Sequence, residues 1–358
     1  MLGSVAMAAV KPFRALRYDE AKAGPLERLV APPFDVISDD ERLQYLERSP
    51  YNVVHLTLPD TEEEAARDFA DWQRDGVLVR DEEPGYWLLS QDYQGPDGVR
   101  RTRNGIVASL TAEPYEQGIV LPHERTHRGP KEGRLRLLRA VRAQLEPIFL
   151  LYDGPALALP GRPPDLEVEG ARLWRVAEAP DFSSTQLLIA DGHHRYETAL
   201  AFAEEGGSPE LMVVLVPTRQ EGLTIFPTHR VVERLSGVNG AEAAAGIGDA
   251  LTQLEELPRD RPAVALYRNG ETRVLKGDEP ELDAAFVERF RPEGITYTPR
   301  VEEAVAAVDS GRAAAAFLLR APTIEQVRTV AQRGETMPQK STYFFPKLTS
   351  GLLFLPLD

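Results

Sequence analysis

The residues best suited to chemistry form a short run that follows an apolar stretch. The run is Asp191-Gly192-His193-His194-Arg195, and it lies between a strand expected at 187–190 and a helix expected at 193–205. A strand that enters a helix through glycine leaves several backbone N–H groups unpaired, at the positive end of the helix dipole. Gly192 lets a ligand approach closely, while two imidazoles and a guanidinium add further donors. The run therefore predicts a phosphate-binding turn.

Asp191 is the candidate metal ligand of this turn. Its carboxylate could fix the tautomer of a neighbouring histidine or hold a Mg²⁺ ion that is bound to phosphates. The sequence has neither GxxxxGK[ST] nor a GxGxxG that opens a helix, so a nucleotide would bind best at 191–195. The alternative is an ordinary helix N-terminus with exposed histidines.

A second candidate segment begins at Pro122 and contains the spacing His-Glu-x-x-His, from His123 through Glu124 to His127. On a stable helix this spacing binds zinc, with the glutamate as the base of a hydrolase. Pro122 before it and Gly129-Pro130 after it leave room for little helix. The context favours Glu124 as a general base in phosphoryl transfer, with His123 beside it. A metal-dependent hydrolase and a solvated loop carboxylate stay as alternatives.

A strongly basic segment covers residues 125–142, where Glu132 is the single acidic residue. A helix is expected at about 131–145, with its leucines on the buried face. The whole chain has a formal net charge of −15, so this local excess predicts that Lys131 or Arg134 meets an anion. Thr126, Lys131 and Arg134 complete the candidate phosphate-binding set. The alternative is a solvated basic face.

The third candidate segment is a turn near the C-terminus, with Lys340, Ser341 and Thr342 in sequence. An ammonium beside two hydroxyls can bind a carboxylate and a phosphate together. Lysine is rare in this chain, and the turn contains Lys340, with Lys347 close behind it. The six lysines are Lys11, Lys22, Lys131, Lys276, Lys340 and Lys347. A capped turn before the last strand is the alternative.

Composition limits the classes of function. The chain has 358 residues, 42% of them hydrophobic and none of them cysteine, which excludes disulfides and thiolate metal sites. A net charge of −15 repels nucleic acid and anionic lipid at long range. No apolar run approaches the length of a membrane helix, and residues 1–10 do not resemble a signal peptide. We expect a cytoplasmic protein whose partners are small molecules, with neither nucleic acid nor membrane among them.

Helical and strand patterns interleave along the chain, which predicts an α/β or α+β fold with a mixed sheet. Among the expected elements are a helix that Ser38 caps and that begins at Asp39, a strand at 52–58 and a helix at 62–75 that Gly76 ends. Strands are expected at 86–92 and 105–110, with a Gly-Pro-Asp-Gly turn at 95–98 between them. The candidate residues all follow position 116. We therefore divide the chain into residues 1–115, of unknown role, and a core at 116–358.

Three stretches resemble the free-serine kinase of archaea, a member of the ParB/sulfiredoxin-like superfamily. The likeness covers roughly 118–350, discontinuously and in the same order. It rests on Pro122-His123-Glu124, on Ile189 to Arg195, and on Arg320 to Val327 followed by Arg333-Gly334-Glu335 and Lys340-Ser341-Thr342.

The whole chain also resembles an uncharacterised bacterial family, known as domain of unknown function 1015. The residues that carry this likeness are Ala31 to Ser38, Ser49 to Val54, Pro227 to Val232 and Met337 to Lys347. The third of these stretches contains His229 and Arg230, which we add to the candidate substrate-binding residues.

The resemblance to the kinase implies a ParB-like catalytic core and transfer of phosphate between a nucleotide and serine. It implies ADP, or else ATP, as the co-substrate, with Mg²⁺ present. Glu124 would be the base toward serine, the turn at 191–195 would hold the nucleotide phosphates, and residues 340–342 would face serine or O-phosphoserine. A different substrate, a reaction that runs mainly as dephosphorylation, and a non-catalytic nucleotide-binding switch stay as alternatives. The oligomeric state is left open.

Overall fold

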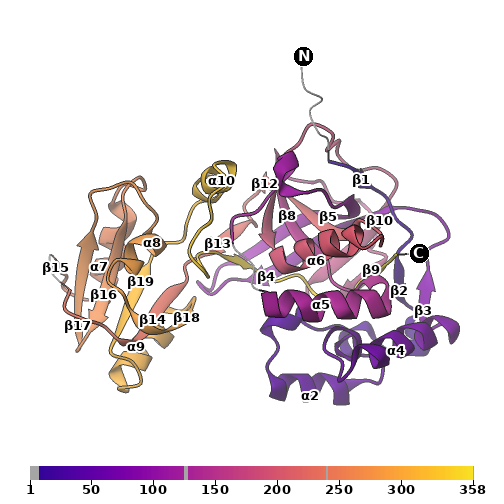
Figure 1. Cartoon of the computed structure of the whole chain (residues 1–358), viewed down its shortest axis with the longest axis horizontal. Helices are drawn as coiled ribbons and strands as arrows, with labels where there is room; N and C mark the ends of the chain where they lie inside the picture. The colour runs from indigo at the N-terminus through magenta and orange to yellow at the C-terminus, as the bar shows by residue number, and fades with distance from the viewer. Residues whose placement is uncertain (1–7, 125–127, 239–240, 358) are drawn as a thin grey trace. The chain divides into compact units, whose positions relative to one another are not determined.

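The computed structural model describes residues 8–124, 128–238 and 241–357, which form two compact units (Figure 1). The first unit contains the described residues up to Gln94, Arg100–Leu223 and the described residues from Pro346 onward. The second contains Gly95–Val99 and the described residues within Thr224–Phe345. Both units combine helices with sheets, so the predicted α/β class is confirmed.

The first unit is built on a mixed sheet with strand order β6-β11-β8-β12-β5-β4-β10-β9, and β1 pairs with β5. β11 runs parallel to β6, β12 runs parallel to β8, and the other pairs are antiparallel. The strands are β1 Val10–Lys11, β4 Tyr86–Gln94, β5 Arg100–Thr111, β6 Val120–Leu121, β8 Ile148–Pro155, β9 Leu166–Val168, β10 Ala171–Val176, β11 Leu187–Asp191 and β12 Glu210–Arg219. Strands from both sides of position 115 thus share one sheet. The compact units do not divide the chain at the predicted boundary between residues 115 and 116.

Three helices of the first unit pack side by side, with α5 between α4 and α6 (Figure 1). They are α4 Glu62–Arg74, α5 Arg128–Val141 and α6 His193–Glu204. The predictions of helices at 62–75 and 193–205 are confirmed. Tyr196 and Ala199 of α6 are fully buried against the sheet residues Leu150, Ile189 and Val213. This apolar contact fixes the helix on the sheet and so fixes the position of its N-terminus.

The segment that precedes α4 differs from the prediction. The strand expected at 52–58 is wrong, because Val54–Thr57 forms the short helix α3. The buried Asn52 explains this difference. Its Oδ1 accepts a hydrogen bond from the Val54 N–H at 3.0 Å, and its Nδ2 donates to the Arg28 carbonyl at 2.8 Å. An asparagine that bonds to nearby backbone in this way favours a turn over a strand, whatever the β-branched residues after it prefer.

Short elements complete the first unit. Upstream of α3, Ser38 caps α2 with a reciprocal hydrogen-bonded pair to Glu41, as a sequence that reads Ser-Asp-Asp-Glu predicts. The chain end returns to this unit, because β21 pairs with β7, and the fully buried Phe354 packs against Tyr18 and Phe69. The elements are α1 Glu20–Ala23, α2 Asp39–Arg48, β2 Leu16–Tyr18, β3 Leu78–Arg80, β7 Ala143–Gln144 and β21 Leu355–Pro356.

The second unit has its own sheet, with strand order β15-β17-β16-β19-β14-β18. Helices α7 and α9 pack against it, and α8 also contacts strands β16 and β19. A separate pair, β13 and β20, joins the two ends of the unit. The elements are β13 Thr224–Phe226, β14 His229–Arg234, β15 Glu242–Ala243, α7 Ile247–Glu256, β16 Ala263–Arg268, β17 Glu271–Lys276, α8 Asp283–Glu288, β18 Glu293–Thr298, α9 Val301–Asp309, β19 Ala315–Leu319, α10 Ile324–Gln332 and β20 Tyr343–Phe345.

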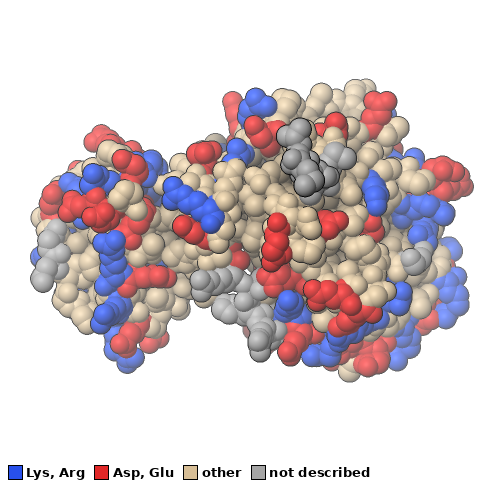
Figure 2. Space-filling model, turned by 45° about the horizontal axis from the view of Figure 1, so that its top comes forward, with Lys and Arg blue, Asp and Glu red and all other residues tan. Residues whose placement is uncertain are grey.

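The surface bears mixed charge. Figure 2 shows Lys and Arg side chains interspersed with Asp and Glu on the face in view. Within the residues that the structure describes, no helix is both long enough and apolar enough to cross a bilayer.

Candidate functional site

The turn between β11 and α6 has the geometry that its sequence predicts. β11 ends at Asp191, Gly192 is the N-cap with φ of +100°, and α6 begins at His193. This left-handed backbone conformation favours glycine. Gly192 has no side chain that could cap the first turn of α6. A helix N-terminus in this state attracts anions.

Asp191 lies between two cations just before this N-terminus. Its Oδ1 forms an ion pair with the Lys347 ammonium, and its Oδ2 accepts a hydrogen bond from Arg195 Nη2 at 3.0 Å. Burial alone would raise the pKa of Asp191, but Lys347 and Arg195 outweigh it and hold that pKa below its usual value. Burial opposes charge on Lys347, yet the Asp191 carboxylate overcomes it and raises the pKa of the ammonium. Asp191 and Lys347 are therefore both charged at neutral pH.

This arrangement does not fit the predicted Mg²⁺ ion on Asp191. Both carboxylate oxygens already contact cationic side chains, and a metal at either oxygen would displace Lys347 or Arg195. Across the described part of the chain, no group of three His, Asp or Glu side chains is placed to hold a metal. The positive charge beside the helix N-terminus comes from the protein itself.

His123 and His193 form a buried pair that ties the second candidate segment to α6. Their rings meet edge to face with centroids 4.6 Å apart, and His193 Nε2 accepts a hydrogen bond from the His123 backbone N–H at 3.3 Å. His123 Nδ1 donates to the Ile189 carbonyl at 2.7 Å. Burial lowers the pKa of His123 to about 4 and, together with His123, holds the pKa of His193 well below its usual value. Both imidazoles are neutral at pH 7.

Glu124 follows this pair and is half-buried. The backbone N–H of His123 donates to His193, the first residue of α6. Glu124 is the next residue in the chain after His123, so it directly follows a residue that contacts this helix N-terminus. Thr126 and His127 lie outside the described residues. The zinc spacing from His123 to His127 therefore stays a prediction.

The remaining residues of the turn differ in their surroundings. His193 is buried, whereas His194 and Arg195 are half-buried. Arg195 turns back toward the sheet, where its Nη1 donates to the Pro147 carbonyl. Its guanidinium also lies beside Gly192, where an added Cβ would come within 3.2 Å of Arg195 Nη2. The side chain of Arg195 is thus fixed next to the helix N-terminus.

The basic helix α5 contributes its cations to neighbouring helices. Lys131 pairs with Glu197 of α6 at 3.3 Å, so the anion it meets is a protein carboxylate. Arg134 donates to the Thr57 carbonyl at 2.7 Å and lies over the Phe34 ring, 3.6 Å from its centroid. These contacts hold α5 in place. A role of Lys131 or Arg134 toward phosphate stays a prediction.

The candidate residues after position 224 belong to the second unit. Lys340 has a left-handed backbone, with φ of +55°, and Ser341 Oγ donates to the Pro338 carbonyl at 2.5 Å. Two more are buried: His229 Nδ1 accepts from the Leu319 N–H at 3.1 Å, and Arg230 Nη1 donates to the Thr228 carbonyl at 2.9 Å. Their hydrogen bonds stabilise the strands and turns of this unit.

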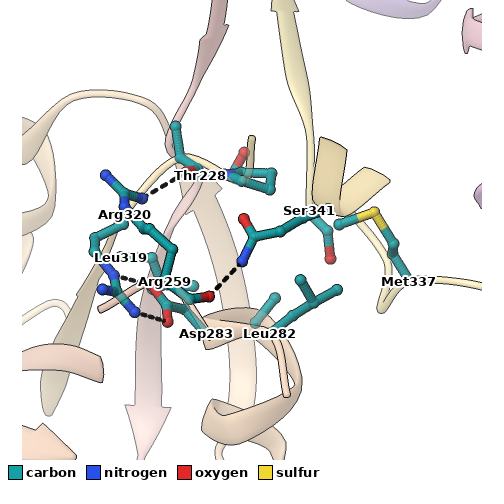
Figure 3. A pocket seen from close by; sticks show the side chains of 12 residues that line it. Thr228, Arg259, Leu282, Asp283, Leu319, Arg320, Met337 and Ser341 are labelled. Atoms are coloured by element: carbon teal, nitrogen blue, oxygen red, sulfur yellow. Dashed lines mark hydrogen bonds and ion pairs between the residues drawn. The ribbon is translucent and has the colours of Figure 1, made fainter. Parts of the chain in front are cut away.

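A small cavity of about 20 Å³ lies among these residues in the second unit (Figure 3). Thr228, Met337 and Ser341 line it, together with the ion pair of Arg320 and Asp283, whose atoms are 2.7 and 2.8 Å apart. Arg320 also donates to three backbone carbonyls around it, so its role here is to stabilise the fold of this unit. A cavity of this volume has room for a water molecule and no more.

Sequence reasoning gave Lys347 no role, although the structure places it in direct contact with Asp191. Its position as one of only six lysines was the available signal. The pairing itself could not be foreseen, because 155 residues separate the two positions in the sequence.

Comparisons with known proteins identify a family and several distant structures. The model of the family described as "Protein of unknown function (DUF1015)" matches residues 10–291. No curated protein matches the sequence.

Three solved structures illustrate the distant likeness. A free serine kinase in complex with AMP is 18% identical, with a TM-score of 0.39, over 65% of this chain and 89% of its own. A conserved hypothetical protein from Pyrococcus furiosus is 18% identical, with a TM-score of 0.37, over 65% of this chain and 92% of its own. SbnI from Staphylococcus aureus, with a C-terminal truncation, is 14% identical, with a TM-score of 0.40, over 67% of this chain and 84% of its own. At these scores the likeness says nothing about what this chain binds.

Proposed function

The chain belongs to the DUF1015 family, and we propose that it is a phosphotransferase that acts between a nucleotide and free L-serine or O-phosphoserine. One observation carries the proposal. The uncapped N-terminus of α6 is flanked by Lys347 and Arg195, and the segment with Glu124 is hydrogen-bonded to its first residue. Phosphoryl transfer needs such donors and cations on one side and a base on the other.

In the proposed reaction, the serine hydroxyl attacks the terminal phosphorus of ADP. Glu124 accepts the hydroxyl proton, the new O–P bond forms, and the bond from that phosphorus to the bridging oxygen breaks, which releases AMP. The amides of α6 and the side chains of Arg195 and Lys347 stabilise the charge on the transferred oxygens. Mg²⁺ would arrive with the nucleotide and neutralise part of its charge.

Other candidate residues take supporting roles in this proposal. His123 and His193, both neutral, position the segment that contains Glu124. His194, Thr126, Lys131 and Arg134 are candidate contacts for the rest of the nucleotide. Lys340, Ser341, Thr342, His229 and Arg230, all of the second unit, stay the candidate substrate-binding residues.

The direct test is turnover. The purified chain is incubated with Mg²⁺, ADP and serine, or with Mg²⁺, AMP and O-phosphoserine, and nucleotides and phosphoserine are quantified by chromatography. We expect turnover in the wild type and a loss of at least about 100-fold in Glu124→Gln, the usual contribution of a general base. Nucleotide affinity should stay within about twofold. Glu116→Gln, an exposed glutamate on the connection before β6, is the control and should change neither.

Three outcomes would contradict the proposal. No turnover with either substrate across a panel of nucleotides would remove it. Nucleotide binding without any turnover would instead indicate a binding switch. Stoichiometric zinc in protein purified without a histidine tag, lost in His127→Ala, would favour the hydrolase.

A further inference from the structure

Arg103 is a buried arginine from the N-terminal part of the chain. It lies on β5 with 1% of its surface exposed. Its Nη2 donates to Gln91 Oε1 at 2.6 Å and to the Pro346 carbonyl at 2.7 Å. The guanidinium carbon is 4.4 Å from the centroid of the Phe149 ring.

Among the residues that the structure describes, the other two nitrogens of this guanidinium have no hydrogen-bond partner. Nε and Nη1 are both inaccessible to solvent and unpaired, and the described structure shows no ion pair of Arg103 with a carboxylate. Burial lowers the pKa of Arg103 to about 10, so the group still carries its charge at neutral pH. A buried charge without a counter-ion is costly, and unpaired buried donors call for an acceptor.

Two contacts and one electrostatic effect place Arg103 beside the Asp191 turn. Pro346, which accepts from Arg103, is bonded to Lys347, the partner of Asp191. Phe149, which lies under the guanidinium, is the Cα partner of Asp191 in the pairing of β8 with β11. The negative charge of Asp191 also acts to raise the pKa of Arg103.

The cluster therefore contains more positive than negative charge. Lys347, Arg195 and Arg103 share the single carboxylate of Asp191. The carboxylate of the buried Glu146 accepts from the Phe34 N–H and from Ser350 Oγ, and its charge acts on Arg134. Asp35 is exposed and acts on both Lys347 and Arg134. An excess of cations beside an uncapped helix N-terminus suits an anion of at least two charges.

We propose that Arg103 is a further anion-binding residue, and that with Lys347 and Arg195 it receives a diphosphate group at the N-terminus of α6. The proposal rests on the proposed function and deepens it, since it names the diphosphate of the nucleotide as the ligand of this cluster. The proposal also gives residues 1–115 a role, because Arg103 adds the donors Nε and Nη1 to those of Arg195 and Lys347.

The competing explanation is that Arg103 has a structural role only, in which its hydrogen bonds to Gln91 and Pro346 join β4 to the C-terminal segment. Loss of a purely structural residue would affect folding but would not change the affinity for an anion in variants that fold. Binding of inorganic pyrophosphate by the full chain, measured by calorimetry, separates the two. Circular dichroism and thermal unfolding of each variant check the fold.

We expect Arg103→Met to weaken pyrophosphate binding on the order of 10- to 100-fold, the size of one or two charge-assisted hydrogen bonds. Arg103→Lys keeps the charge but loses the planar donor set, and should weaken binding by a smaller factor. Arg172→Met is the matched control. Arg172 lies on β10 of the same sheet and already pairs with Asp92 at 2.7 Å. The Arg172→Met variant should therefore bind pyrophosphate with the affinity of the wild type.

Each outcome decides the proposal. Wild-type affinity in a folded Arg103→Met variant would overturn it and leave the phosphotransferase proposal standing. Unfolding of Arg103→Lys would mark the residue as purely structural and overturn it as well. A wild type that binds no pyrophosphate would also overturn it, while turnover with serine would still decide the proposed function independently.

Discussion

At the scale of single residues, the site is governed by how burial sets charge. Lys347 and Asp191 stay ionised because each lies against the other, whereas burial lowers the pKa of His123 and His193 and keeps both imidazoles neutral. Burial and nearby charge thus act together to set the charge of each group. An anion bound at the N-terminus of α6 would therefore have fixed cations and uncharged imidazoles around it.

The neutral histidines predict a pH dependence of stability. An unfolded histidine has a pKa near 6.5, whereas folding lowers that of His123 to about 4. Below pH 6.5 the unfolded state binds a proton that the folded state rejects, so the free energy of unfolding decreases as pH falls from about 6.5 toward 4. For His123, the free energy of unfolding at pH 5 should be lower than at pH 7 by on the order of 2 kcal/mol. Urea unfolding at pH 7 and pH 5 measures it.

Two variants isolate the contribution of the pair. In His123→Asn the amide can still donate to the Ile189 carbonyl, and in His193→Gln the amide oxygen can still accept, but neither titrates. Each should lose less stability between pH 7 and pH 5 than the wild type. Asp191 does not obscure the result, because its lowered pKa moves its own contribution below pH 3.8. An unchanged pH dependence in both variants would show that these histidines are not the cause.

Residues also show how far the candidate site could be predicted. The type and spacing of residues 191–195 were enough to expect an uncapped helix N-terminus, since that feature depends on neighbours in sequence. Lys347 and Arg103 depend on long-range contacts: Lys347 pairs with Asp191, and Arg103 donates to the carbonyl of Pro346. Long-range pairing of this kind leaves no local pattern in a single sequence.

At the scale of elements, Gly192 is the residue on which the helix N-terminus depends. Its φ of +100° is strained for any side chain, and an added Cβ would meet the Arg195 guanidinium at 3.2 to 3.3 Å. Gly192→Ala should lower the free energy of unfolding by roughly 1–2 kcal/mol and move Arg195 from the site. We expect pyrophosphate affinity, measured by calorimetry, to fall roughly tenfold, the value of one charge-assisted hydrogen bond.

The other end of the same helix provides the control for this variant. Gly206 follows α6 with φ of +86°, and no atom lies within 4 Å of an added Cβ. Gly206→Ala should therefore cost similar stability through the backbone while pyrophosphate affinity stays unchanged. Equal losses of affinity in both variants would show that general destabilisation, and not the position of Arg195, sets binding.

Elements were predictable where local signals agreed with the fold. The capped helices α2 and α4 begin where Ser38 and Thr61 precede acidic residues, and both caps form. The helix α3 was mistaken for a strand because Val53 and Val54 favour β structure, while the deciding contacts of Asn52 reach back to the loop at 28–30. Contacts of that range override propensity.

At the scale of the whole molecule, the second unit is inserted into the first. Apart from the short turn Gly95–Val99, which also belongs to the second unit, the chain leaves the first unit after Leu223 and returns to it at Pro346. The Cα atoms of Thr224 and Phe345 are partners in the pairing of β13 with β20, so the two crossing points are about 5 Å apart. A short linker could therefore replace everything between them.

This topology predicts what each unit contributes. Excision of residues 224–345 with a two-residue Gly-Ser linker should leave a folded first unit, because the core around β8, β11 and β12 and the C-terminal Phe354 all belong to it. Its pyrophosphate affinity should stay within about threefold of the full chain, since Arg103, Arg195 and Lys347 are all retained. Turnover of serine should vanish, because Lys340, Ser341 and Thr342 are removed. Calorimetry and the nucleotide assay measure the two effects. Retained turnover would refute the assignment of the substrate turn, and a folded first unit without anion affinity would refute the assignment of the phosphate site to Arg103, Arg195 and Lys347.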